Sequence, residues 1–165
     1  MSILVDIAYL IALPFVIAFA AISRLKGHPA RKDLNDRLGA GVCLERHPKR
    51  VLLHAVSVGE VNAIRTLVSE LKERSFDVVI CVTTDTGLQR AKELFGHDHT
   101  ITRYPVDFSF SIRRFLNRTK PTVIALVELE VWPNLVGMSF SNGIPVVVIN
   151  GRLSERSYRR YKFAR

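Results

Sequence analysis

Residues 51–60 read Val-Leu-Leu-His-Ala-Val-Ser-Val-Gly-Glu, and this stretch decides the fold of the chain. Its apolar start, rich in Val and Leu, predicts a buried strand over residues 51–57. Gly59 is expected to let the backbone turn tightly. Glu60 follows at once and heads a segment with helical spacing of apolar residues. A carboxylate at the end of a first strand lies where open α/β sheets bind ligands, although a first-turn acid also complements a helix dipole.

The same alternation of apolar runs and helical patterns continues along the chain. Strand–helix alternation with short connections predicts a parallel α/β sheet with right-handed crossovers. Five strands fit a Rossmann-like, doubly wound sheet in the order 3-2-1-4-5. The expected strands are 51–57, 77–83, 99–104, 122–127 and 145–149, and the expected helices are 60–74, 86–95, 108–117 and 131–141.

This order makes the first and fourth strands neighbours, with a ligand crevice above them. Glu60 follows the first strand, and Glu128 and Glu130 follow the fourth. The fold therefore predicts that two carboxylate-bearing loops meet. Two acids in one crevice repel each other unless they are used or paired, which favours a site. The alternative is that Glu128 and Glu130 are first-turn helix acids and that Trp132 packs in the core.

Three other polar stretches each allow two interpretations. Thr83 and Thr84 open a helix and can hold an anion, but plain N-capping explains them equally well. Asp107 is expected to cap the helix that begins near residue 108. His54 lies inside a strand and indicates a hydrogen-bonded core histidine more than a ligand. The run 97–99 (His-Asp-His) has a metal-like composition, but we expect it to be exposed in a helix-to-strand loop.

Composition indicates a globular chain with an anionic partner. The 165 residues are 48% hydrophobic and carry 24 Lys and Arg against 15 Asp and Glu, a formal charge of +9. Nucleic acid, anionic lipid or a phosphorylated substrate would each suit this charge. We do not expect nucleic acid, because the chain has no recognised nucleic-acid motif and its positive charge flanks an apolar segment. Cys43 and Cys81 have no metal-type spacing and are expected to be reduced thiols, with Cys81 in the core.

The first 23 residues predict a membrane anchor. Residues 3–22 are apolar except for Asp6 and Tyr9, and twenty helical residues can cross a bilayer. The basic segment 24–50 follows with a net charge of +5, which favours a helix with its N-terminus outside and this segment in the cytoplasm. A cleaved signal peptide is the rival, but no Lys or Arg precedes the apolar run. The basic segment could also be a solvated linker.

Taken together, these segments closely resemble the N-terminal half of the 3-deoxy-D-manno-octulosonic acid (Kdo) transferases of lipopolysaccharide assembly. The blocks that carry the resemblance occur in family order: Arg37-Leu38-Gly39, residues 54–60 (His-Ala-Val-Ser-Val-Gly-Glu), Thr83-Thr84 with Thr86-Gly87, Pro105 with Asp107, residues 128–135 (Glu-Leu-Glu-Val-Trp-Pro-Asn-Leu) and residues 150–154 (Asn-Gly-Arg-Leu-Ser).

The resemblance implies an inverting glycosyltransferase of GT-B type, with two Rossmann-like domains facing across a cleft. It implies a CMP-Kdo donor, a lipid A precursor as acceptor, and no cofactor or metal ion. The enzyme would work at the cytoplasmic face of the inner membrane, against its anionic lipids. Carried onto this sequence, Glu60 is the general base and Glu128 the second carboxylate. The residues expected to bind the acceptor are Ser57, Gly59, Thr83, Thr84, Glu130, Trp132 and Arg152.

On this interpretation residues 51–165 form the acceptor domain, and the family's C-terminal donor domain is not among these 165 residues. The chain is then a truncated reading frame or is complemented by a separate polypeptide, and alone it is expected to be inactive. Two other classes remain open. One is a GT-B transferase that uses another sugar nucleotide, and the other is a non-catalytic, membrane-anchored lipid-binding module.

Overall fold

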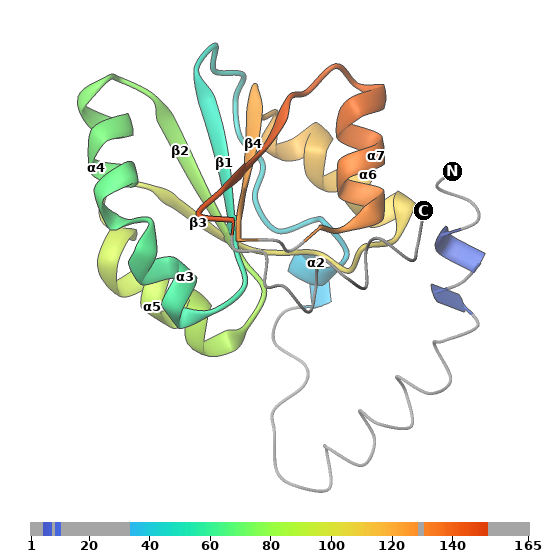
Figure 1. Cartoon of the computed structure of the whole chain (residues 1–165). Helices are drawn as coiled ribbons and strands as arrows, with labels where there is room; N and C mark the ends of the chain where they lie inside the picture. The colour runs from blue at the N-terminus through green and yellow to red at the C-terminus, as the bar shows by residue number, and fades with distance from the viewer. Residues whose placement is uncertain (1–4, 8, 11–33, 129–130, 152–165) are drawn as a thin grey trace, which may run out of the picture.

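A computed structural model describes residues 5–7, 9–10, 34–128 and 131–151, which build a five-stranded parallel sheet (Figure 1). Its strand order is β3-β2-β1-β4-β5, and each neighbouring pair is parallel. The predicted order 3-2-1-4-5 is therefore confirmed. The strands are β1 (Arg50–Ala55), β2 (Asp77–Val82), β3 (Thr100–Arg103), β4 (Val123–Val127) and β5 (Val146–Ile149).

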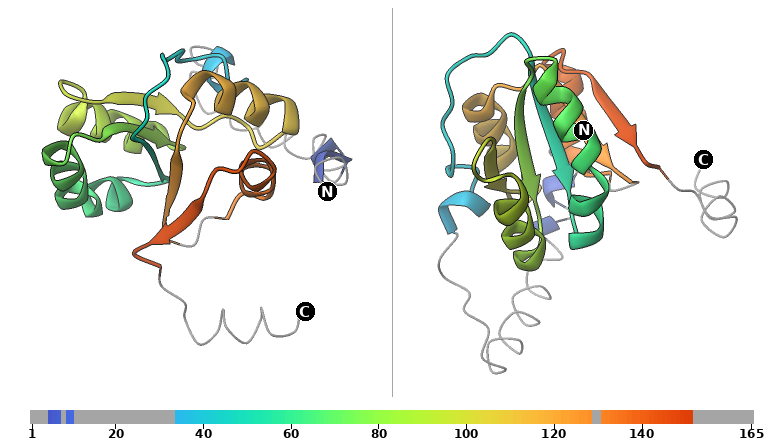
Figure 2. Two further views of the ribbon diagram at one scale, coloured as in Figure 1. Left: turned by 90° about the horizontal axis from the view of Figure 1, so that it is seen from above. Right: turned by 90° about the vertical axis from the view of Figure 1, so that its left-hand side faces the viewer.

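Helices cover both faces of the sheet, as right-handed crossovers in a doubly wound fold require (Figures 1 and 2). One face of the sheet, at the left in Figure 1, carries α3 (Val58–Ala63), α4 (Arg65–Glu73) and α5 (Asp85–Phe95). The other face carries α6 (Ser109–Thr119) and α7 (Pro133–Ser141). The expected helix 60–74 is divided by a turn at Ile64 into α3 and α4.

Each face of the sheet has its own apolar core. Alternate residues of a strand point to opposite faces, so β1 contributes to both cores. Because both faces are covered, the central runs of β2, β4 and β5 are apolar throughout instead of alternating. One core includes Val51, Leu53, Ala55, Val61, Ile80 and Val127, and the other includes Leu52, Cys81, Tyr104, Ile112, Leu126 and Leu135. Cys81 is buried, as predicted, and its burial raises the pKa of the thiol.

The segment before β1 packs on the domain. It begins with the short helix α2 (Leu34–Arg37) and then runs along α6. Leu44 N donates to Arg118 O, and Arg118 Nε donates to Val42 O. Gly39 has a φ of 73°, and a Cβ there would stand 2.2 Å from the Ser111 carbonyl oxygen of α6. Only glycine allows this approach. Together with the hydrogen bonds to Arg118, the contact at Gly39 holds the second half of the expected linker 24–50 to the domain.

The N-terminal residues that the structure describes, 5–7 and 9–10, are helical and lie beside α6 and α7 (Figures 1 and 2). Asp6 and Tyr9, the two polar residues of the apolar run, hydrogen-bond to this side of the domain. These contacts place the described part of the apolar run against the domain. Most of the predicted anchor, residues 11–22, lies outside the described residues. Within the described ranges, no helix has the length and apolarity needed to cross a bilayer.

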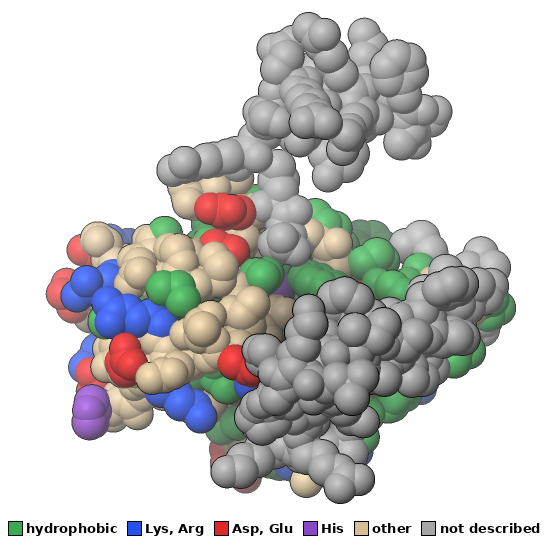
Figure 3. Space-filling model, turned by 90° about the horizontal axis from the view of Figure 1, so that it is seen from below, with side chains coloured by type: hydrophobic (Ala, Val, Ile, Leu, Met, Phe, Trp, Pro, Cys, Tyr) green, Lys and Arg blue, Asp and Glu red, His purple; other side chains and the backbone are tan. Residues whose placement is uncertain are grey.

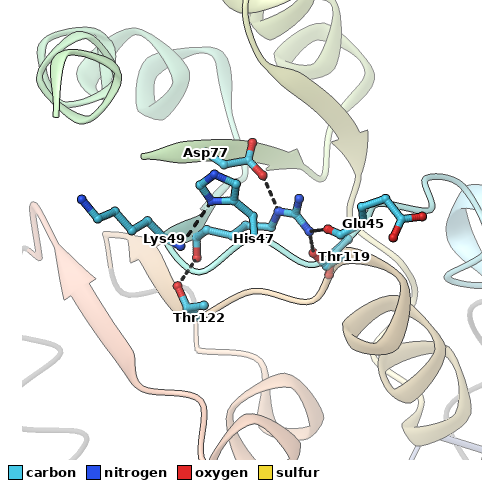
Figure 4. A network of polar contacts seen from close by, with 7 residues as sticks. Glu45, His47, Lys49, Asp77, Thr119 and Thr122 are labelled. Atoms are coloured by element: carbon cyan, nitrogen blue, oxygen red, sulfur yellow. Dashed lines mark hydrogen bonds and ion pairs between the residues drawn. The ribbon is translucent and has the colours of Figure 1, made fainter. Parts of the chain in front are cut away.

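A buried arginine joins three segments at the amino edge of the sheet. Arg50 is 5% exposed, and its Nε lies 2.6 Å from Asp77 Oδ2 of β2. Its Nη1 donates to two carbonyl oxygens, those of Glu45 and Thr119, at 2.7 Å each. Figure 4 shows these partners converging from the pre-β1 segment, β2 and the end of α6, with Thr122 bonding to the backbone nearby.

We predict that Arg50→Met destabilises the fold by about 2–4 kcal/mol, because it leaves Asp77, the buried Thr119 carbonyl and the part-buried Glu45 carbonyl without their donor. The matched control is Arg74→Met, since Arg74 makes an exposed pair with Glu70 on α4, which we expect to contribute within about 0.5 kcal/mol. Urea unfolding of the two variants measures the difference. Equal unfolding midpoints would contradict the role of Arg50.

Candidate functional site

The register of β1 and β4 brings the two carboxylate-bearing loops together. His54 pairs with Leu126, so two residues further on Val56 stands level with Glu128. Neighbouring strands are about 4.8 Å apart. The connections after β1 and β4 then leave toward opposite faces of the sheet, to α3 and to α7. The switch point predicted from sequence therefore lies between these two loops, and we call this edge of the sheet the crevice.

Glu60 is bound back to the end of β1. Its Oε2 accepts from Val56 N at 2.7 Å, and its Oε1 accepts from Ser57 Oγ at 3.0 Å. Ser57 is the N-cap of α3 and also accepts from Glu60 N. The motif Ser-x-x-Glu thus forms a variant of the capping box, in which the serine accepts from Glu60 N and the glutamate accepts from the Ser57 hydroxyl and from Val56 N, one residue before the N-cap. Glu60 is only 6% exposed, so its carboxylate has a fixed position.

Two expectations about this loop were wrong. The strand ends at Ala55, and Ser57 is a helix cap instead of a strand residue. Gly59 does not make the turn, because it lies inside α3, and a Cβ there would meet only Ser57 Oγ at 3.8 Å. The capping box makes the turn, which is why the chain turns without a left-handed glycine.

Glu128 directly follows β4 and has a strained conformation. Its φ is 61°, in the left-handed region, which costs a non-glycine residue roughly 1–2 kcal/mol. Its N donates to Ile149 O of β5, which holds the strained backbone in place. Strain of this kind clusters at functional sites. Glu128 is half-buried, and its neighbour Glu130 lies outside the described residues.

The two threonines after β2 have different partners. Thr84 caps α5 by accepting from Gly87 N, and its hydroxyl donates to Val56 O at 2.7 Å. The capping interpretation is therefore confirmed for Thr84. Thr83 Oγ1 lies 3.2 Å from His54 Nε2 and is half-buried at the crevice. Both threonines thus connect the end of β2 to the end of β1.

An aromatic cluster lies under the crevice on the α6–α7 face. The His54 ring is 4.4 Å from that of Tyr104, and Trp132 lies 5.2 Å from Tyr104 and 6.3 Å from His54. His54 is fully buried, and this burial lowers the pKa of the imidazole to about 4. His54 is therefore the neutral core histidine that the sequence predicts. Trp132 packs in this cluster, as the alternative interpretation expected.

Asp107 caps a different helix from the one predicted. Its carboxylate accepts from Asn134 N and Leu135 N at 3.0 Å each, so it caps α7 instead of α6. Tyr104 and Tyr9 donate to the same carboxylate. Burial raises the pKa of Asp107, and these four donors act in the opposite direction. Sequence spacing cannot show this cap, because 27 residues separate Asp107 from Asn134.

Arg103 is a residue at the crevice that the sequence reasoning missed. It ends β3, is 3% exposed, and contacts Asp85 of α5 and the Thr83 carbonyl. A cation at the end of a predicted strand was the available signal. From below, toward the carboxyl ends of the strands, acidic and basic side chains are mixed on the side of the domain where α3 and α5 lie (Figures 1 and 3). Arg152, the other cation predicted for the site, lies outside the described residues.

The histidine-rich run 97–99 lies in the loop between α5 and β3. His97 is exposed and His99 half-buried, while Asp98 pairs with Lys72 of α4 at 2.8 Å. No group of three His, Cys, Asp or Glu side chains with metal-binding geometry occurs among the described residues. The expectation that this loop faces solvent is confirmed for His97 and Asp98.

The fold and the crevice define the class of this chain: a doubly wound α/β domain with a fixed carboxylate at its ligand-binding edge. Residues 32–165 match the family described as 3-deoxy-D-manno-octulosonic-acid transferase (kdotransferase). The chain belongs to this Kdo transferase family, as its motifs predicted.

Three relatives illustrate the similarity. The chain is 37% identical over 155 residues to the 3-deoxy-D-manno-octulosonic acid transferase of Haemophilus influenzae, covering 92% of this chain and 36% of the relative. It is 39% identical to the Bordetella pertussis enzyme of the same name, over 67% of this chain and 27% of the relative. It is 36% identical to a bifunctional glycosyltransferase/methyltransferase of Fusobacterium nucleatum, over 78% of this chain and 21% of the relative. The chain therefore spans about a third or less of these proteins.

We predict an acid-sensitive component of stability that belongs to His54. Its folded pKa of about 4 lies below the ordinary value of 6.5, so the unfolded chain takes up a proton first. The contribution of His54 to the free energy of unfolding is fully present above pH 6.5 and is lost as the pH falls toward 4. Between about pH 7.5 and about pH 5 it amounts to about 2 kcal/mol.

Urea unfolding at the two pH values measures this loss in the wild type and in His54→Gln, which removes the titrating ring. The matched control is His97→Gln, because His97 is exposed. We expect the pH dependence to shrink in His54→Gln and to persist in His97→Gln. An unchanged pH dependence in His54→Gln would show that the acid sensitivity comes from other groups.

Proposed function

We propose that this chain is the acceptor-binding part of an inverting GT-B glycosyltransferase of lipopolysaccharide biosynthesis. The reaction moves Kdo from CMP-Kdo to a lipid A precursor. The observation that carries the proposal is the Glu60 carboxylate, held at the end of β1 beside the loop that follows β4. Membership of the Kdo transferase family supports the reaction class.

In this mechanism Glu60 is the general base. A hydroxyl oxygen of the acceptor attacks the anomeric carbon of Kdo, and the bond from that carbon to the CMP phosphate oxygen breaks. The hydroxyl proton goes to Glu60, and CMP leaves with the bonding electrons. General-base catalysis of this kind typically contributes about 10²–10⁴-fold in rate.

The hydrogen bonds of Glu60 suit this role. An ionised carboxylate offers roughly four acceptor positions, of which Val56 N and Ser57 Oγ occupy two. The remaining positions can accept the proton of a bound hydroxyl. The two existing bonds fix the carboxylate before the acceptor arrives, so no side-chain ordering is required during the reaction.

We assign Glu128 as the second carboxylate, which orients the acceptor or the base. Its strained backbone supports this assignment, and so does its position opposite Val56 in the continued register of β1 and β4. Thr83 and Trp132 border the same crevice and are proposed to contact the acceptor. The same role is proposed for Ser57, Gly59, Thr84, Glu130 and Arg152.

Donor binding is assigned to a second domain of GT-B type, because the chain matches only 36% of the Haemophilus influenzae relative. We therefore expect the 165 residues alone to hold an acceptor without transferring Kdo. The apolar N-terminal segment and the basic residues that follow it are proposed to attach the protein to anionic lipids at the cytoplasmic face of the inner membrane. A bisphosphorylated lipid acceptor suits the formal charge of +9.

We predict that Glu60→Gln in the full-length protein lowers Kdo transfer by at least about 10²-fold, because glutamine cannot take up the proton. Glutamine also serves at this position of a capping box, since its amide can accept from Val56 N and donate to Ser57 Oγ. The fold and acceptor binding should therefore persist. The matched control is Glu70→Gln, an exposed glutamate on α4, which should leave transfer unchanged.

Turnover with CMP-Kdo and a lipid A precursor, combined with a lipid-binding assay, measures both effects. Unchanged turnover in Glu60→Gln would reject Glu60 as the base. Loss of turnover together with loss of acceptor binding would assign Glu60 to acceptor binding instead.

A further inference from the structure

The N-termini of α6 and α7 are capped by residues distant in sequence. The N-cap positions are Phe108 and Trp132, and neither side chain can accept a hydrogen bond from the first turn. A helix start without a cap leaves backbone N–H groups unsatisfied. Asp6 Oδ1 accepts from Ser109 N of α6, and Asp107 caps α7. The carboxylate that caps the start of α6 therefore belongs to Asp6 of the N-terminal segment.

Asn134 joins the two caps. Its Nδ2 donates to Asp6 Oδ1 and to the Asp107 carbonyl oxygen, and its backbone N donates to Asp107 Oδ2. Asn134 is only 1% exposed. Tyr9 adds a hydrogen bond of 3.0 Å to Asp107 Oδ2. We call Asp6, Tyr9, Asp107 and Asn134 the N-terminal clasp.

The clasp leads to the crevice. Asp107 also accepts from Tyr104, whose ring packs between His54 and Trp132. Trp132 ends the loop that carries Glu128 and directly precedes α7. The clasp therefore fixes the start of α7 and, through Tyr104 and Trp132, the floor of the crevice.

We propose that residues 5–7 and 9–10 are a permanent part of the folded domain, held by Asp6 and Tyr9, so that this part of the apolar run stays on the domain's side of the membrane. Asp6 and Tyr9 interrupt an apolar run of the sequence, and in the structure both side chains point to the domain. Their polar atoms find helix N–H groups and a carboxylate there, and burial in lipid would leave them without partners. The hydrogen bonds to Ser109 N and Asn134 also lower the pKa of Asp6, although its burial acts in the opposite direction.

This proposal is independent of Kdo transfer and rests on the proposed function only for the membrane attachment. Hydrogen exchange of the full-length protein in detergent tests the clasp itself, and it needs no enzymatic activity. We expect Asp6→Ala to lower the amide protection of the first turn of α6, at Ser109, about tenfold, because its cap is lost. We also expect reduced protection at residues 134–136, through the loss of the Asn134 contact.

Three further variants sharpen the result. Asp6→Asn keeps an acceptor oxygen and should restore most of the protection. Tyr9→Phe removes only the hydroxyl and should affect the start of α7 more than that of α6, because Tyr9 contacts Asp107. Ile7→Ala is the matched control, since Ile7 lies in the same turn with 47% of its surface exposed. Equal protection in Asp6→Ala and Ile7→Ala would overturn the clasp.

The side of the membrane is tested with a cysteine at residue 7. Ile7→Cys is combined with Cys43→Ser, because Cys43 is exposed and Cys81 is buried. A membrane-impermeant maleimide is applied to spheroplasts before and after the inner membrane is opened. We expect the cysteine at residue 7 to react only after opening, as Cys43 of the wild type does. Reaction before opening, or no reaction in either state, would overturn the proposal.

Discussion

The fold depends on the hydrogen bonds between the Glu60 carboxylate and the residues that follow β1. The capping box of Ser57 and Glu60 ends the strand, starts α3 and satisfies the Val56 amide at the same time. Because Val56 stands level with Glu128, the same contact places a carboxylate at the switch point between β1 and β4. One local motif thus has a structural role and supplies the group proposed to act in catalysis.

The crevice is built from interactions that connect distant parts of the chain. Thr84, at the start of α5, donates a hydrogen bond to the Val56 carbonyl. Asp107, in the loop between β3 and α6, accepts one from the start of α7. The helices α5 and α7 are therefore fixed at their N-termini, where the positive end of each helix dipole lies. Such an arrangement holds the site rigid before ligand arrives, which favours a preorganised carboxylate over a mobile one.

The strand order and most element boundaries could be predicted from the sequence, because apolar runs such as 122–127 and short connections leave few possible topologies. Local motifs were less certain. Gly59 was expected to make a turn that the Ser57–Glu60 capping box makes instead. The cap of α7 by Asp107 and the contacts of Asp6 could not be predicted, since they join residues 27 and 103 positions apart. The polar residues within the apolar N-terminal run were the available signal that this segment contacts the domain.

The most direct test of the central claim is a structure of the full-length protein with an acceptor lipid and an unreactive donor analogue. The account predicts that the attacking hydroxyl oxygen of the acceptor lies within about 2.6–3.2 Å of a Glu60 carboxylate oxygen, in the crevice between the loops after β1 and β4. An acceptor bound elsewhere, with the Glu60 carboxylate contacting only Val56 N and Ser57 Oγ, would contradict it and reduce Glu60 to a helix cap.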